Sequence, residues 1–154
     1  MKKQTIRRGL VPAVAAAALV LGATGLPSAG ATGMQAHKAP LTQTNRACDA
    51  SVIGDTRTEA FGFVNLIRPA SGKLVAVVVL KGATPNTTYD IRLIQLVPGD
   101  TDCRTVDGTL TTDADGNGSA TVQEKILPGA TKAWIDLNNH ADYTQFYDTA
   151  VLSF

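Results

Sequence analysis

The chain has 154 residues, with 14 Lys or Arg against 13 Asp or Glu, and its two cysteines are Cys48 and Cys103. Four of the cationic residues and none of the acidic ones fall within residues 1–31, so the rest carries 10 against 13, a net charge of about −3. This balance gives no electrostatic reason to expect a nucleic acid or an anionic membrane as a partner. The length fits one domain with a core of its own.

Residues 1–31 are typical of a secretory signal peptide. A basic start precedes an uncharged segment, 10–26, rich in Ala, Val and Leu, and small residues at 29–31 match a signal-peptidase site. This design predicts cleavage after Ala31 and a secreted, extracellular protein. The alternative is an uncleaved anchor, but the segment is shorter than the roughly 20 apolar residues of a membrane span. The pair Arg7-Arg8 leaves twin-arginine export open beside the general route.

Residues 32–46 are mostly small and polar and show no periodicity. They predict a flexible N-terminal arm in front of a domain at 47–154. Cys48 and Cys103 both follow the signal, and in an oxidising compartment they predict one disulfide, with two free thiols as the alternative. The bond would close a loop of about 55 residues, which chain entropy values at roughly 4 kcal/mol.

From Cys48 onward, short alternating segments rich in Thr and Val are separated by turn signals. This pattern predicts strands. The segment 74–80 is apolar on both faces, which predicts a central strand covered on both sides. In the segment 60–68, Phe61, Phe63 and Ile67 are expected to share a face. The predicted strands are 49–54, 60–68, 73–81, 88–97, 105–112, 119–126, 131–138 and 147–154. They predict an all-β, two-sheet sandwich of about seven to eight antiparallel strands.

Two segments carry resemblances to known families. The stretch LKGATPNTTYDI at 80–91 resembles the tyrosine corner of fibronectin type III and other immunoglobulin-like domains. That resemblance implies an immunoglobulin-like sandwich in which Tyr89 bonds through its hydroxyl to the backbone upstream. The hairpin at 108–120 looks like those of small secreted actinobacterial β-sandwich proteins, most of which have no assigned activity. The same hairpin and the ending at 150–154 are distantly similar to the enediyne apoproteins, which implies a small-molecule carrier.

A calcium-loop pattern lies in the same hairpin. Asp113, Asp115, Asn117, Gly118 and Glu124 satisfy the EF-hand spacing, with hard oxygen ligands at alternate positions. The flanks are strand-like, however, and an extended chain would place Glu124 about 20 Å beyond the turn. The pattern therefore favours a hairpin turn held by Asx hydrogen bonds. A weak calcium site at Asp113, Asp115 and Asn117 is the alternative.

Groups for catalysis are sparse. His37 falls in the predicted arm, so His140 is the one plausible general base, and no nucleophile motif accompanies it. A hydrolytic site needs a base beside a nucleophile and a third group that orients the base. We therefore predict no catalytic residue and interpret His140 as a solvated loop side chain.

Trp134 is the candidate binding residue. Alternation places it on the face opposite Ala133 and Ile135, and the aromatic residues Tyr143, Phe146 and Tyr147 follow it in the chain. Together these rings are expected to form a platform for a sugar or a protein. The alternative is that loops or the arm cover Trp134, or that the strand 131–138 is buried on both faces.

The sequence thus predicts a secreted, non-catalytic binding module without a cofactor, whose partner is an extracellular protein or glycan. Two alternatives stay open. One is a small-molecule carrier with a cleft at one end of the sandwich, and the other is an extracellular hydrolase with an unrecognised site.

Overall fold

A computed structural model of the chain describes residues 34–154, and the predicted signal peptide at 1–31 lies outside them. Among the described residues there is no α-helix, and so none that could cross a membrane. The strands are β1 (Gln35–Pro40), β2 (Gln43–Arg46), β3 (Val52–Arg57), β4 (Gly62–Arg68), β5 (Lys73–Leu80), β6 (Thr88–Gln95), β7 (Gly108–Thr111), β8 (Gly118–Lys125), β9 (Lys132–Asn139), β10 (Phe146–Asp148) and β11 (Leu152–Ser153).

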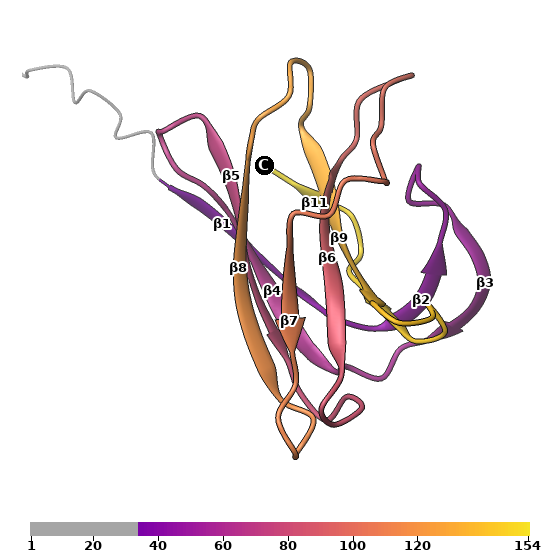
Figure 1. Ribbon diagram of the computed structural model, residues 1–154. Coiled ribbons are helices and arrows are strands. Elements are labelled where there is room, and N and C mark those ends of the chain that lie inside the picture. The colour runs from indigo at the N-terminus through magenta and orange to yellow at the C-terminus, as the bar shows by residue number, and fades with distance from the viewer. Residues whose placement is uncertain (1–33) are drawn as a thin grey trace, which may run out of the picture. The chain divides into compact units, whose positions relative to one another are not determined.

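Two antiparallel sheets face each other, as Figure 1 shows. One has the strand order β1-β4-β5-β8, and the other has the order β10-β9-β6-β7 with β11 added alongside β9. The strands β2 and β3 form a small third sheet beside them. The prediction of an all-β two-sheet sandwich is confirmed.

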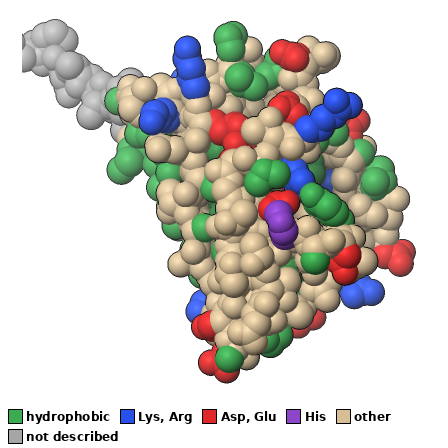
Figure 2. Space-filling view, viewed as in Figure 1, with side chains coloured by type: hydrophobic (Ala, Val, Ile, Leu, Met, Phe, Trp, Pro, Cys, Tyr) green, Lys and Arg blue, Asp and Glu red, His purple; other side chains and the backbone are tan. Residues whose placement is uncertain are grey.

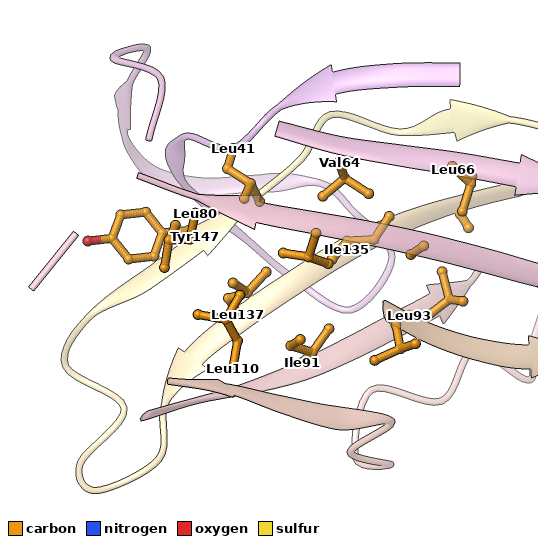
Figure 3. Packing of buried hydrophobic residues seen from close by; sticks show 14 of the residues in the cluster. Leu41, Val64, Leu66, Leu80, Ile91, Leu93, Leu110, Ile135, Leu137 and Tyr147 are labelled. Atoms are coloured by element: carbon orange, nitrogen blue, oxygen red, sulfur yellow. The ribbon is translucent and has the colours of Figure 1, made fainter. Parts of the chain in front are cut away.

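Side chains that alternate along the strands fill the space between the sheets. On β5 the inward residues are Leu74, Ala76, Val78 and Leu80, and none of them is exposed. In Figure 3, Val64 and Leu66 of one sheet point toward Ile91 and Leu93 of the other. The predicted inward faces of β6 and β9 are confirmed, with Tyr89, Ile91, Leu93, Ala133, Ile135 and Leu137 all in this core.

The outer face of the four-stranded sheet differs from the prediction in two ways. Val75, Val77 and Val79 lie on this face and remain partly exposed, so β5 is covered on one side only. On β4 the core residues are Val64 and Leu66, while Phe63 and Ile67 point outward. Asn65 lies on the same face of β4 as Phe63 and Ile67. If that face pointed inward, the amide of Asn65 would be buried in the apolar core, which is unfavourable.

The predicted flexible arm at 32–46 is wrong for its described residues, because 35–46 contain β1, the core residue Leu41 and β2. The strand β1 pairs with β4 over six residues, from Gln35 opposite Arg68 to Pro40 opposite Phe63. Leu41 then enters the core, where it is fully buried. These backbone hydrogen bonds and the burial of Leu41 offset the entropy of ordering the segment. Pro40 is tolerated because β1 is an edge strand and Pro40 is its last residue.

The turn between β2 and β3 packs on the outer face of the five-stranded sheet. Ala50, between the two strands, packs with Ile94 of β6 and Trp134 of β9. A disulfide joins Cys48 to Cys103, with the two Cα atoms 5.8 Å apart, as the sequence predicted.

The last predicted strand, 147–154, is interrupted. It consists of β10 and β11, and Thr149 between them donates its backbone N–H to the carbonyl of Ile135. Phe154 enters the core from the end of the chain.

Candidate functional site

A cleft opens where the two sheets meet beside the strand β7. This strand pairs only with Thr88–Ile91, the first half of β6, so the second half of β6 has no strand on that side. The loop that contains Cys103 passes in front of the gap and leaves a cleft of about 420 Å³. Its lining residues are Leu93, Gln95, Asp100, Asp102, Thr105, Asp107, Glu124, Lys125 and Leu127.

The base of the cleft is fixed by Gln95, whose side chain is 2% exposed. Its Nε2 donates to Oε2 of Glu124 and to the backbone carbonyl of Lys125, each at 2.9 Å. Its Oε1 accepts a hydrogen bond of 3.0 Å from the backbone N–H of Leu127. One amide therefore ties β6 of one sheet to β8 of the other, and it holds Glu124 in place.

Two carboxyl groups meet above this amide. Oδ2 of Asp107 accepts a 2.6 Å hydrogen bond from the backbone N–H of Leu93. Burial and the neighbouring carboxyl of Asp107 raise the pKa of Glu124 to about 7, although the hydrogen bond from Gln95 lowers it. A carboxyl with this pKa is partly protonated at neutral pH. With Asp100 and Asp102 on the rim, the cleft presents four acidic side chains against Lys125.

The aromatic platform predicted around Trp134 is not formed. Trp134 is 3% exposed, because Ala50 in the turn between β2 and β3 packs against it together with Leu96 and Cys103. Tyr147 lies in the core, with its ring centroid 5.0 Å from that of Phe61 and 5.5 Å from that of Tyr89. Tyr143, in the loop before β10, is 54% exposed. Phe146 is half-buried and lies on the face of β10 opposite to Tyr147. The alternative, in which other segments cover Trp134, is the correct one.

His140 has a structural partner that the sequence did not indicate. Its Nδ1 lies 2.8 Å from Oδ1 of Asp90, a β6 residue that is 3% exposed. The hydroxyl of Tyr143 lies 3.5 Å from the other oxygen of Asp90, and the Tyr143 ring lies 5.7 Å from the guanidinium of Arg92. The loop between β9 and β10 thus folds over β6, and Asp90 orients the imidazole. His37 lies on β1, is half-buried, and is not part of this pair.

The hairpin between β7 and β8 has the geometry of a turn. Oδ1 of Asp113 accepts hydrogen bonds from the backbone N–H groups of Asp115 and Asn117, at 2.9 and 2.8 Å. Glu124 pairs with Leu74 near the far end of β8 and lies in the cleft, so it cannot complete the EF-hand pattern. Within residues 34–154, no three His, Cys, Asp or Glu side chains come together in a way that could hold a metal ion.

Tyr89 is a core residue, but its hydroxyl does not make the predicted hydrogen bond to the backbone upstream. It donates instead to Oε1 of Gln145, 56 residues further along the chain, at 3.3 Å. The tyrosine at this position therefore links the start of β6 to the loop before β10.

Sequence reasoning missed the cleft. Gln95 and Asp107 carry no motif, and Glu124 was considered only as a calcium ligand. These residues come together because β7 is shorter than β6 and leaves part of it unpaired. No local sequence pattern predicts that difference in length. Figure 2 shows acidic and basic side chains interspersed over the viewed face, without a large patch of one sign.

Comparison of the chain with protein-family models, with curated proteins and with solved structures finds no match. The function therefore has to be argued from the site itself.

Proposed function

We propose that this protein is a secreted, non-catalytic binding module and that it holds its ligand in the cleft between β6, β8 and the Cys103 loop. The observation that carries the proposal is the cleft with Gln95 locked at its base. A concave site with a few convergent polar groups and a carboxyl of raised pKa is where ligands bind in most folds.

The chemistry of the lining indicates the kind of group that fits. Leu93 and Leu127 offer apolar contact, and the acidic side chains around Glu124 favour a ligand that carries a positive charge. Because three hydrogen bonds hold Gln95, the base of the site is ordered before binding, which reduces the entropy lost when a ligand binds.

Two observations support secretion and the immunoglobulin-like family. Structural disulfides such as Cys48–Cys103 persist in oxidising compartments, which agrees with the signal-like N-terminus. The orders β4-β5-β8 and β10-β9-β6-β7 correspond to strands A-B-E and G-F-C-C′ of immunoglobulin domains. In that correspondence Tyr89 begins strand C, whereas the tyrosine corner of these domains begins strand F.

The proposal is tested by amide chemical shifts of the secreted protein, measured with three probes added in turn. The probes are spermidine, a lysine-rich peptide and a chitin oligosaccharide. We expect a cationic probe to shift the amides of Leu93, Gln95 and Lys125. The variant Leu127→Arg, which adds a positive charge at the mouth of the cleft, should weaken binding at least tenfold, and Tyr143→Ala should leave it unchanged. Shifts centred on Tyr143, or equal binding by both variants, would refute the cleft as the site.

A small-molecule carrier is the second candidate. The volume of the cleft, about 420 Å³, lies within the roughly 300–1,000 Å³ of small-molecule sites. Native mass spectrometry of protein recovered from the medium distinguishes the two. A bound small molecule that disappears in Leu127→Arg indicates a carrier, and protein recovered free of ligand indicates a module for a macromolecular partner.

The pair of Asp90 and His140 is the observation that favours the third candidate, a hydrolase. A buried carboxylate that fixes one imidazole nitrogen is two-thirds of a hydrolytic triad. Turnover of an ester panel that is lost in both His140→Ala and Asp90→Asn would support an enzyme. Among the described contacts of His140, none is to a hydroxyl nucleophile.

A further inference from the structure

The strand β3 leaves one edge unpaired. Within the described residues it pairs only with β2, and Figure 1 shows it outermost, at the right of the view. All six of its residues are exposed, including Val52 at 50% and Ile53 at 61%. A strand edge of this kind presents a row of backbone N–H and C=O groups to which another strand can pair.

The other edge strands are short or protected. The strand β1 carries Lys38 and ends in Pro40, and charged Lys and Pro are residues that block edge pairing. The strands β2, β7, β10 and β11 have four, four, three and two residues. The strand β8 is the other edge of the four-stranded sheet, and its eight residues end in Lys125. The strand β3 has six residues and contains neither Lys nor Pro. Its charged residues are Asp55 and Arg57, one of each sign, so its net charge does not oppose pairing with another strand.

The charges of β3 indicate what pairs with it. Asp55 and Arg57 are two residues apart, so their side chains lie on the same face of the strand. If two copies pair in antiparallel fashion about a two-fold axis at Thr56, Asp55 of each copy lies opposite Arg57 of the other. An axis at Asp55 would instead place two carboxylates against each other. Opposite charges on paired strands stabilise the pair, and like charges destabilise it.

We propose that β3 pairs with β3 of a second copy of this chain, antiparallel and with Thr56 on the two-fold axis. The dimer then contains two reciprocal pairs of Asp55 with Arg57 and a central pair of threonines. In this register Asp55, Thr56 and Arg57 of the two β3 strands lie opposite one another, and Val52 faces Ala60, which follows β3 in the chain. This surface is separate from the cleft, so the dimer and the ligand site can be tested independently.

The test is sedimentation velocity of the secreted protein from micromolar to millimolar concentration. We expect a dimer that weakens as salt increases. The single variants Asp55→Arg and Arg57→Asp each place like charges opposite each other and should raise the dimer dissociation constant at least tenfold. The double variant, which exchanges the two charges, should restore it. Lys73→Glu, on the exposed start of β5, is the matched control and should dimerise as the wild type does.

Three results would overturn the proposal. The first is a wild-type protein that stays monomeric at millimolar concentration, which would leave β3 to a different partner. The second is single variants that dimerise as well as the wild type, which would place the interface elsewhere. The third is a double variant as weak as the single ones, which would exclude the Asp55–Arg57 register. The emission of Trp134, buried beneath the same hairpin, reports whether each variant is folded.

Discussion

Gln95 is the side chain on which the candidate site most depends. It is the last residue of β6, beyond the part of β6 that pairs with β7. Its side chain makes hydrogen bonds to Glu124 and Lys125 of β8 and to Leu127, which follows β8. The bonds join the two sheets at the point where the cleft opens. A polar residue that is this well satisfied can remain in an apolar interior without destabilising it.

Replacing Gln95 with Leu is expected to lower the free energy of unfolding by roughly 2–4 kcal/mol. Leucine has a similar shape but leaves the carboxyl of Glu124, the carbonyl of Lys125 and the N–H of Leu127 without their partner. Urea unfolding measures the change. Gln123→Leu is the matched control, because Gln123 lies beside Glu124 on β8 but is exposed. This substitution should change the free energy of unfolding by less than about 0.5 kcal/mol. Equal effects of the two substitutions would show that the three hydrogen bonds contribute nothing.

Gly116, in the hairpin between β7 and β8, occupies a position where a side chain cannot fit. Its φ is +77°, and a Cβ atom there would lie 2.1 Å from the backbone oxygen of Ala83. Gly116→Ala should therefore destabilise the protein by more than the roughly 1 kcal/mol that a positive φ alone costs. Gly72→Ala is the control, since its φ is +73° and nothing lies within 4 Å of the Cβ position. If both variants show the same urea midpoint, the contact with Ala83 is relieved without cost.

At the scale of elements, alternation predicted the strands that face the core. The segments 73–81, 88–97, 119–126 and 131–138 agree with β5, β6, β8 and β9 to within a few residues at each end, because each strand turns at least one face to the core. The strand β1 was missed because its sequence, QAHKAP, has no alternating pattern. Backbone hydrogen bonds and the burial of the neighbouring Leu41 hold this edge strand in place. Neither depends on which side chains β1 carries, so its sequence shows no strand pattern.

Contacts of several kinds attach the sheet of β2 and β3 to the rest of the described fold. Ala50 packs on Trp134, Nε of Arg46 lies 3.5 Å from Oδ1 of Asp148, and the disulfide holds the turn. The sequence could assign Trp134 to the outer face of its strand, but it could not show that residues 43–57 fold over that face. Burial of this tryptophan is a consequence of tertiary structure.

Removing the disulfide is expected to loosen this small sheet and expose Trp134. In the double variant Cys48→Ser with Cys103→Ser, the emission of Trp134 should shift to longer wavelength and become accessible to iodide, while the β-sheet circular dichroism persists. The loss in unfolding free energy should be at most roughly 4 kcal/mol, the entropy of the closed loop. Reductant should reproduce these changes in the wild type and have no effect on the variant. Unchanged emission in both would show that the contacts of Ala50 and the ion pair of Arg46 with Asp148 hold the sheet in place without the disulfide.

For the whole molecule, the candidate site arises from long-range convergence. Gln95, Asp107 and Glu124 come from β6, the Cys103 loop and β8, and they meet because β7 is too short to cover all of β6. The sequence predicted the sandwich and the disulfide but could not predict the cleft, since the length of β7 depends on its pairing and not on its composition. The same convergence places carboxyl groups where solvent is scarce.

Buried carboxyl groups, one in the cleft and two outside it, determine how the stability of the molecule depends on pH. Burial raises the pKa of Glu124 to about 7, that of Asp148 to about 7 and that of Asp136 to about 6, despite the guanidinium groups near the two aspartates. In the unfolded chain these groups ionise near pH 4. Between about pH 4 and pH 7 the folded protein therefore binds more protons than the unfolded chain, and the free energy of unfolding falls as pH rises.

We accordingly expect the urea midpoint to be higher at pH 5 than at pH 8. The carboxyl groups of Asp49, Asp102 and Asp142, whose pKa values are lowered by hydrogen bonds from neighbouring Ser and Thr residues or backbone amides, act in the opposite direction but only below about pH 4. Glu124→Gln and Asp148→Asn should each flatten the slope between pH 5 and pH 8, because each removes one of the groups that release a proton on unfolding. A midpoint that rises from pH 5 to pH 8 in the wild type would mean that these carboxyl groups are charged in the folded protein at pH 5, and it would refute the raised pKa of Glu124.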